Sequence, residues 1–386
     1  MKVPFIDLSL QHTDDMDAIM EAIGQVFTEN SFILGPAVEN FEKACAKLLG
    51  VPHAIGVNSG TDALLMSLKA LGVGAGDEVI VPTFTFVAVA DVVVRAGARP
   101  IFVDVDPLTY NMAIDSVTQA ITPRTKAIIA VHMFGQACDL AQLMQIANAH
   151  GIFLIEDVSQ AMGGQIGKKY LGTMGVTGCF SFYPTKNLGG VGDGGLVVTH
   201  NDEVAERIRR YRDHGRDATG LFQDIGFNSR LDSIQAAVLT IKLEELEEMI
   251  ADRTENARYY CDMLAESALV LPEFHERGEH TYNLFTVQCE QRDALRKFLA
   301  DRQIGSAIYY DRPLHLQPCF AYLGYKEGDF PVAELLCARV ISLPVYPGMK
   351  RKDLEEVSLT IHEFLAMQAA NVPAAEVPAG EGPAQA

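Results

Sequence analysis

The stretch DEVIVPTFTFVAVADVVVRAGARPIFVDVD, residues 77–106, decides the class of fold. It begins with a β-branched run, DEVIVP (77–82), continues with a helical pattern, FVAVADVVVRAG (86–97), and ends with a second β-branched run, RPIFVDVD (99–106). Strands that are apolar on both faces are typical of parallel sheets covered by helices on both sides. The stretch therefore predicts a strand–helix–strand unit of a mostly parallel sheet.

The same alternation extends on both sides of this unit. A helical pattern at 139–151 ends on a glycine, and the nearly all-apolar run IFLIEDV (152–158) predicts a strand directly after it. The other predicted elements are strands at 53–58, 178–184 and 194–200, a strand that runs into a loop at 125–135, and a helix at 61–71. Strands that alternate with helices place the chain in the α/β class.

The pattern changes after about residue 235. Residues 232–267 form one long helical pattern, and β-rich pieces at 281–290 and 305–310 and helical ones at 332–341 and 351–369 follow. This texture predicts a smaller α+β domain. We expect a large α/β domain over 1–250 and a small domain over 251–370. The Pro-, Ala-, Gly- and Glu-rich tail 371–386 is expected to be disordered.

The composition excludes several classes of function. The 386 residues carry a net charge of −19, which argues against a broad nucleic-acid surface. There is no run of 18 apolar residues and no signal-peptide pattern, so we expect no membrane segment and a cytoplasmic location. The seven cysteines are scattered without a CxxC pair, which suits reduced thiols, and the His and Cys spacings match no zinc pattern. No metal is expected.

Two motifs stand where predicted strands end, which is where open parallel sheets bind ligands. In VNSGTDAL (57–64), the N–H groups of Gly60 and Thr61 open a helix and could hold a phosphate; ordinary helix capping is the alternative. In LIEDVSQA (154–161), Asp157 ends an apolar strand and needs a partner. A protonated pyridinium nitrogen and a structural salt bridge both fit.

A third motif is FSFYPTKNLGGVGDGG (180–195). Ser181 could donate its hydroxyl to a phosphate, and Lys186 follows a proline that ends the strand. A lysine in a partly apolar site has a lowered pKa and can act as nucleophile and then as base, whereas a surface lysine is the ordinary alternative. The glycines precede a strand rather than a helix, so they form no dinucleotide fingerprint, and the chain has no P-loop.

A fourth motif, GFNSRLDSIQAA (226–237), puts Asn228 and Arg230 before the long helix. Arginine suits a carboxylate or a phosphate, and helix capping beside a solvated arginine is the alternative. Phe84 and Phe86 supply aromatic rings near another strand end. A lysine, an acid, an aromatic ring and a phosphate cup are together what pyridoxal 5′-phosphate requires.

These motifs occur in the order found in a known family. From VPFIDLSLQ (3–11) and SFILGPAVENFE (31–42) to FPVAELLCARVISLPVYPGM (330–349), the chain resembles the DegT/DnrJ/EryC1/StrS sugar aminotransferases. The resemblance covers about residues 3–350. It implies a fold type I pyridoxal-phosphate enzyme, with a mostly parallel seven-stranded sheet sandwiched by helices and a smaller C-terminal α+β domain.

The resemblance also implies roles for individual residues. Lys186 would carry the cofactor as an internal aldimine, and Asp157 would pair with the pyridinium nitrogen. Gln160 would bond the ring hydroxyl, and Phe86 would stack on the ring. The cofactor phosphate would be held by Gly60, Thr61, Ser181 and, from the neighbouring subunit, Asn228. A homodimer with shared sites follows from that last contact.

The implied reaction moves an amino group from L-glutamate to a nucleotide-linked keto-sugar through a pyridoxamine form. Dehydratases of the family have histidine at the lysine position, so Lys186 favours transamination. A 3-keto sugar on UDP or dTDP, with a UDP-linked 3-keto-N-acetylhexosaminuronate as one candidate, is favoured over a 4-keto-6-deoxy sugar. Arg230 could meet the sugar carboxylate or that of glutamate. Sugar contacts are expected from Tyr309, Tyr310 and His315, although many relatives have His-Tyr-Pro at 309–311. A dehydratase and a non-catalytic cofactor-binding regulator remain alternatives.

Overall fold

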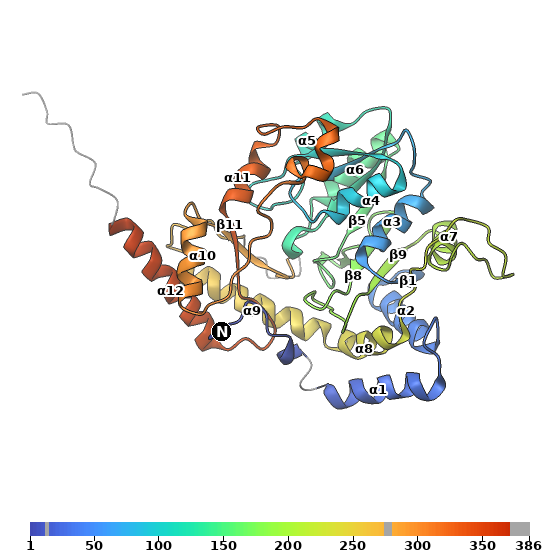
Figure 1. Ribbon diagram of the computed structural model, residues 1–386, viewed down its shortest axis with the longest axis horizontal. Coiled ribbons are helices and arrows are strands. Elements are labelled where there is room, and N and C mark those ends of the chain that lie inside the picture. The colour runs from blue at the N-terminus through green and yellow to red at the C-terminus, as the bar shows by residue number, and fades with distance from the viewer. Residues whose placement is uncertain (12–14, 274–279, 371–386) are drawn as a thin grey trace, which may run out of the picture.

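A seven-stranded sheet forms the centre of the molecule in Figure 1. The computed structural model describes residues 1–11, 15–273 and 280–370, so the predicted disorder of the tail 371–386 lies outside the described residues. Across the sheet the strands are β1 (His53–Val57), β9 (Gly195–Thr199), β8 (Thr177–Ser181), β5 (Phe153–Asp157), β4 (Thr125–Val131), β2 (Glu78–Pro82) and β3 (Arg99–Val103). The predicted α/β class and the seven strands are confirmed.

Five neighbouring strands, from β8 to β3, run parallel, and β9 lies antiparallel to both β8 and β1. The register pairs Val131 of β4 with Asp157 of β5, and Asp157 in turn with Cys179 of β8. Parallel pairing brings the carboxyl ends of these strands to one edge of the sheet. Asp157 and Ser181, the last residues of β5 and β8, therefore lie at that edge.

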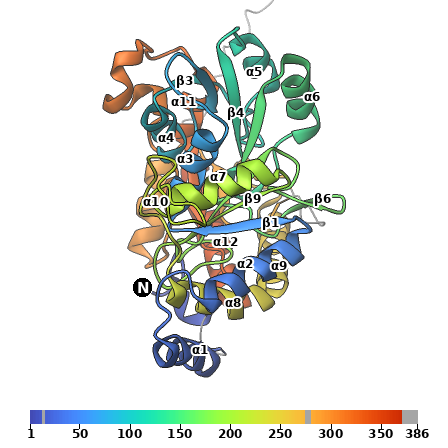
Figure 2. The same cartoon turned by 90° about the vertical axis from the view of Figure 1, so that its right-hand side faces the viewer.

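Helices cover both faces of the sheet, and Figure 2 shows α7 and α2 on opposite sides of β1. One face carries α3 (Gly60–Ala70), α4 (Ala88–Ala96) and α7 (Asp202–Arg212); the other carries α2 (Pro36–Leu49), α5 (Ile114–Ala120), α6 (Leu140–His150) and α8 (Ser233–Glu244). In β4, Ala127 and Ile129 pack into the first layer, whereas Ile128 and Ala130 pack into the second. Burial on both faces is why the strands read as continuous apolar runs.

A smaller layer completes the chain. It contains α9 (Leu246–Leu264), β10 (Phe285–Gln288), α10 (Arg292–Asp301), β11 (Val340–Leu343) and α12 (Arg351–Ala370), whereas α11 (Pro331–Arg339) packs into the cluster of the large sheet. A separate apolar cluster joins α9, β10, β11 and α12, and Val3 of the N-terminus is buried in it. Because Val3 packs with these later elements, the structure does not divide the chain simply at residue 250. The predicted domain boundaries 1–250 and 251–370 stay a prediction.

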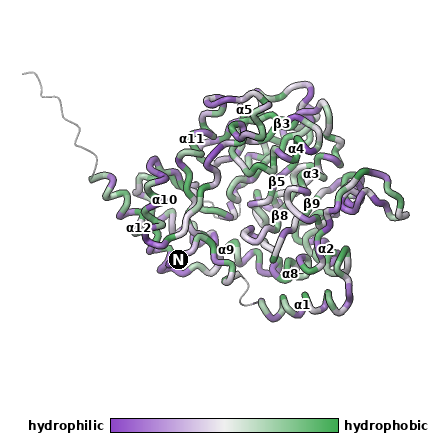
Figure 3. Tube along the Cα trace, in the orientation of Figure 1, coloured by the Kyte–Doolittle hydropathy of each residue, from purple (hydrophilic) through white to green (hydrophobic). Residues whose placement is uncertain are grey.

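The remaining elements are short or peripheral: η1 (Leu8–Gln11), α1 (Met16–Glu29), η2 (Met133–Gly135), β6 (Gln165–Ile166), β7 (Lys169–Tyr170), η3 (Leu314–Leu316) and η4 (Pro318–Leu323). Figure 3 shows hydrophilic and hydrophobic residues alternating along α1 and α12, as in amphipathic helices. No helix in the described part of the chain has both the length and the apolar character needed to cross a bilayer.

Two predicted elements are wrong. The long helix over 232–267 is two helices, α8 and α9, separated at Glu245, whose backbone leaves the helical region (φ −97°, ψ 0°). Leu239 of α8 packs into the sheet core and Tyr260 of α9 into the smaller cluster, so the chain bends between two cores. The β-rich piece 305–310 forms a single bridge, from Ala307 to Ser342, rather than a strand.

Candidate active site

A cavity of about 860 Å³ opens where β5 and β8 end and α3 begins. This is within the size range of small-molecule and cofactor sites. Most of the predicted site residues line it: Gly60, Thr61, Phe86, Asp157, Gln160, Ser181, Lys186, Tyr309 and Tyr310. The fold therefore gathers residues that are up to 250 positions apart in the sequence (60 to 310) around one space.

The first turn of α3 forms a cup at this cavity. Ser59 caps the helix by accepting the Asp62 N–H at 3.1 Å, which leaves the N–H groups of Gly60 and Thr61 at the helix start. A Cβ at Gly60 would lie 2.7 Å from the Ser181 Cβ, so only glycine lets α3 approach β8 this closely. The Ser181 Oγ accepts the Tyr183 N–H at 3.4 Å, which leaves its proton to donate. Backbone N–H groups and a hydroxyl at a helix start suit a phosphate.

Asp157 lies at the edge of the sheet with only 5% of its surface exposed. Its Oδ1 accepts the Ser159 N–H at 3.0 Å. Burial raises the pKa of this carboxyl, and the hydrogen bonds from Ser159 and the charge of Lys186 offset part of the rise. A buried carboxylate is stabilised by a cationic N–H partner, which the protonated ring nitrogen of a pyridoxal cofactor supplies.

Lys186 lies on the loop after β8, where its N–H donates to the Tyr183 carbonyl at 2.9 Å across Pro184. Burial lowers the pKa of this lysine from 10.5 to about 8, and the charge of Asp157 offsets part of that change. An amine with such a pKa is partly neutral near pH 7 and can act as nucleophile and base. The cup, the acid and the amine thus meet the three polar requirements of pyridoxal phosphate.

The comparisons with known proteins agree with this geometry. The family model of the DegT/DnrJ/EryC1/StrS aminotransferase family matches residues 13–362. The chain belongs to this family. It is accordingly a fold type I aminotransferase with pyridoxal phosphate as its cofactor.

Three similar proteins illustrate the relationship. A UDP-N-acetyl-3-dehydro-α-D-glucosamine 3-aminotransferase of Acidithiobacillus ferrooxidans is 43% identical over 94% of this chain and 98% of that protein. A pleiotropic regulatory protein of Geobacillus stearothermophilus is 41% identical over 94% of this chain and 99% of that protein. The crystal structure of S. venezuelae DesV with a ketimine intermediate is 39% identical, with a TM-score of 0.91, and the match covers 94% of this chain and 98% of that one.

The glycines after Lys186 let this loop of the aminotransferase fold back on itself. A Cβ at Gly189 would lie 2.3 Å from the Pro184 carbonyl oxygen. From α8, the buried Lys242 Nζ donates to the Gly189 carbonyl at 2.6 Å, and Gln235 Oε1 accepts the Val191 N–H at 2.9 Å. The loop is therefore fixed between Pro184 and α8, which holds Lys186 at the cavity.

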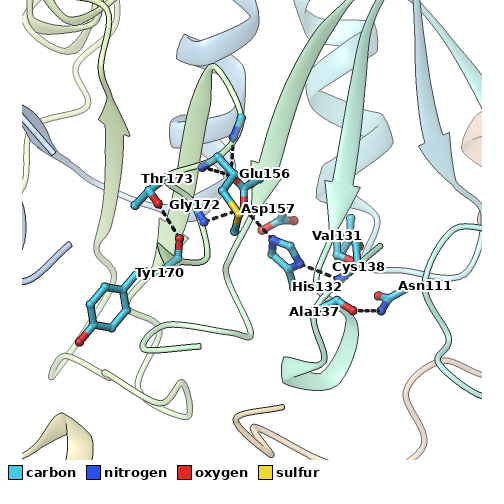
Figure 4. A network of polar contacts seen from close by, with 12 residues as sticks. Asn111, Val131, His132, Ala137, Cys138, Glu156, Asp157, Tyr170, Gly172 and Thr173 are labelled. Carbon is cyan, nitrogen blue, oxygen red and sulfur yellow. Dashed lines mark hydrogen bonds and ion pairs between the residues drawn. The ribbon is translucent and has the colours of Figure 1, made fainter. Parts of the chain in front are cut away.

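A buried network of hydrogen bonds lies next to Asp157 (Figure 4). The neighbouring Glu156 accepts three backbone N–H groups of the loop 172–175 at 2.6–2.8 Å and pairs with His132 Nε2 at 3.2 Å. His132 Nδ1 accepts the Cys138 N–H, so the ring proton is on Nε2. Burial raises the pKa of Glu156, but these hydrogen bonds outweigh it and the net pKa is lowered. The backbone N–H of His132 donates to the backbone carbonyl of Asp157 at 3.1 Å, and this bond connects the network to the end of β5.

Of the aromatic and amide residues considered for the cofactor ring, Phe86 and Gln160 line the cavity and Phe84 does not. Phe86 is 54% exposed and lines the cavity, whereas Phe84 is 1% exposed in the core. Gln160 Oε1 accepts the Phe134 N–H at 2.9 Å, so its NH₂ group is the donor, and one hydrogen bond of this side chain goes to Tyr310 at the cavity. The Tyr310 ring lies 6.3 Å from that of Phe86. Phe86 and Gln160 are thus placed where a cofactor ring and its hydroxyl could be met.

Three predicted residues do not line this cavity. His315 is 1% exposed and uses both ring nitrogens, toward Thr83 Oγ1 at 2.8 Å and Glu334 Oε1 at 3.1 Å, and its contact with a sugar stays a prediction. Arg230 donates to Asp213 Oδ1 at 2.6 Å and to Asn228 Oδ1 at 2.5 Å. The prediction puts Asn228 in the cavity of a second subunit, and it stays a prediction.

The sequence reasoning missed other lining residues, chiefly Arg312 and Asp193. Arg312 stands between Tyr310 and His315, two of the expected sugar contacts, and Asp193 is the one acid in the glycine-rich loop. A charged residue within a recognised motif was the available signal. In the described residues, no group of three or more His, Cys, Asp or Glu side chains converges as metal ligands.

The lowered pKa of Lys186 predicts how cofactor loading depends on pH. At pH 7 an amine with a pKa near 8 is about 10% neutral, against about 0.03% for an ordinary lysine. The neutral form attacks the aldehyde, so the loading rate should rise about tenfold per pH unit below 8 and level off above it. Stopped-flow absorbance of cofactor-free protein mixed with pyridoxal phosphate measures this rate. A rate that keeps rising to pH 10 would contradict the assignment.

Proposed function

We propose that the enzyme transfers an amino group from L-glutamate to C3 of a 3-keto sugar linked to UDP or dTDP. The observation that carries this proposal is the convergence of Lys186, Asp157 and the α3 cup on one cavity. The cavity is larger than a cofactor alone requires. The Acidithiobacillus relative, by its name, acts at C3 of a UDP-linked sugar. We place the enzyme in the cytoplasm, in polysaccharide biosynthesis; its seven cysteines are all unpaired, which suits a reducing compartment.

The chain's own residues would divide the work of catalysis. The bound cofactor serves as the electron sink for the charge left when a proton leaves the substrate carbon. Gly60, Thr61 and Ser181 would hold its phosphate by donated hydrogen bonds, and Asp157 would keep its ring nitrogen protonated. Lys186 Nζ would carry the proton from Cα of glutamate to the cofactor in the first half-reaction, and from the cofactor to C3 of the sugar in the second.

A two-step spectroscopic experiment tests this function. Glutamate added to the cofactor-loaded enzyme should convert its absorption to that of the pyridoxamine form and release 2-oxoglutarate. A 3-keto nucleotide sugar should then restore the first spectrum faster than a 4-keto-6-deoxy sugar. Faster recovery with the 4-keto sugar would favour the alternative substrate class. A bound cofactor that glutamate leaves unchanged would favour a regulator, the function named for the Geobacillus relative.

We further propose that two subunits share each site. Because Arg230 donates to the Asn228 Oδ1, the Asn228 NH₂ group is left as a donor, and Asn228 is exposed. This orientation suits the phosphate of a cofactor in a neighbouring subunit. The cup in the chain itself has backbone and hydroxyl donors, and an amide from a partner would add to them.

Mixed dimers test the shared site. Lys186→Ala and Asn228→Leu homodimers should each be impaired, one in chemistry and the other in retention of the cofactor. In a mixed dimer, one site combines the intact Lys186 of one chain with the intact Asn228 of the other, so about half of the wild-type activity per dimer should return. Activity no higher than that of the separate variants, in dimers verified by mass, would rule out sharing through Asn228.

A further inference from the structure

The cavity is lined by fewer cationic than acidic side chains among the described residues. Among the lining residues that the structure describes, the cations are Lys186 and Arg312, and the acids are Asp157, Asp193 and Asp311. Lys186 is committed to the cofactor in the proposed function. Arg312 is exposed, and no ion pair of its guanidinium occurs within the described ranges. It is therefore the cation that remains available to an anionic substrate.

The backbone that carries Arg312 is fixed at both ends. Ala307 exchanges two hydrogen bonds with Ser342 of β11, at 2.8 and 3.2 Å. Leu314 N–H donates to the Thr83 carbonyl at 2.8 Å, and the buried His315 bonds the Thr83 hydroxyl. The segment 307–315 thus joins the smaller layer to the end of β2 and holds Arg312 at one wall of the cavity. A short anchored segment positions a side chain more closely than a free loop would.

Two anions enter this cavity in the proposed reaction: the carboxylates of glutamate and the diphosphate of the nucleotide sugar. A guanidinium binds both kinds of oxygen, but a diphosphate carries more charge and offers more acceptors. The chain has a net charge of −19, so it does not attract a dianion at long range and needs a local cation. The exposure of Arg312 suits the diphosphate, which lies beyond the sugar ring and away from the reacting carbon.

We propose that Arg312 binds the diphosphate group of the nucleotide sugar. The inference rests on the proposed function, because it names the residue that distinguishes the second substrate from the first. Arg312 then contributes to the second half-reaction alone, and it makes the diphosphate a requirement for tight binding. Arg230, which the sequence had offered as the substrate cation, is already paired with Asp213 and Asn228.

Isothermal titration of the cofactor-loaded enzyme with UDP tests the proposal without any turnover. Arg312→Gln should raise the Kd for UDP by about 10- to 100-fold, as expected for a lost charge-assisted hydrogen-bonded pair. Arg312→Lys keeps the charge and should recover part of the affinity. Arg296→Gln, an exposed residue of α10 outside the cavity lining, makes the same change in net charge and should stay within about twofold of wild type.

A second measurement separates the two possible anions. The rate of the glutamate-driven spectral change should stay within about threefold of wild type in Arg312→Gln. If that rate falls as much as UDP affinity does, Arg312 binds the donor carboxylate and the proposal is wrong. Unchanged UDP affinity in Arg312→Gln, or a wild type that binds neither UDP nor dTDP, also overturns it. Failure of the proposed function appears separately, as a wild-type spectrum that glutamate does not alter.

Discussion

Lys186→Ala is expected to lower kcat for transamination by at least about 10³-fold, while the protein still folds and binds its cofactor through the α3 cup. Among the residues that the structure describes, Lys186 is the one amine that lines the cavity, and the variant lacks it. Lys242 is a second buried lysine with a pKa lowered to about 8, chiefly by burial, but its Nζ donates to the Gly189 carbonyl and it lies outside the lining. Within the described ranges, no other lysine is therefore in place to move the proton.

Single-turnover absorbance with glutamate measures this loss directly. Lys168→Ala, at an exposed lysine away from the cavity, is the matched control and should behave as wild type. Methylamine or ethylamine should partly restore the Lys186→Ala rate, because a small amine can occupy the space left by the side chain. A variant that retains more than a tenth of the wild-type rate would show that another group moves the proton.

Much of the fold could be predicted because the strands of the sheet appear in the sequence as continuous apolar runs. Strands such as β4 bury alternate residues in two different helical layers, so every position is apolar. The site followed from the same reasoning. Asp157 and Ser181 end strands, Gly60 starts a helix, and Lys186 follows a proline, so each stands where a parallel sheet presents its ligand.

What failed depends on contacts between distant residues. The break at Glu245 contains neither proline nor glycine; it arises because α8 and α9 pack into different cores. The hydrogen bond of Arg230 to Asp213, 17 positions away, was not expected either, and the role of Arg230 toward a substrate stays a prediction. Local sequence cannot show such pairings, because a partner is chosen by tertiary packing and not by spacing.

Similarly, His315 was expected to contact the sugar because it closely follows Tyr309 and Tyr310 in the sequence. Its partners Thr83 and Glu334 come from the end of β2 and from α11, and they leave neither ring nitrogen free. Arg312, three residues earlier, lines the cavity together with Tyr309 and Tyr310. The segment 307–315 does lie at the cavity, but which of its side chains reach the cavity depends on how the segment is anchored.

Asp157→Asn should lower kcat by about 10²- to 10³-fold, the cost typical of removing one preorganised electrostatic partner of the developing charge. Asparagine has the same shape and can still accept the Ser159 N–H, which Asp157 accepts at 3.0 Å. It carries no negative charge, however, and so cannot keep the ring nitrogen of the cofactor protonated. The loss should appear in both half-reactions, because both use the same electron sink. Single-turnover rates with glutamate and with the keto-sugar measure it.

Thermal unfolding separates this electrostatic role from a structural one. Burial raises the pKa of Asp157, which means that the cofactor-free protein holds this charge at a cost. Asp157→Asn should therefore leave the Tm of the cofactor-free protein equal or higher, while the increase in Tm on adding pyridoxal phosphate becomes smaller. Asp115→Asn, at an exposed acid in the first turn of α5, controls for the loss of one charge. A lower Tm without cofactor would instead show that the carboxylate stabilises the end of β5, and the fall in kcat could then reflect a displaced strand.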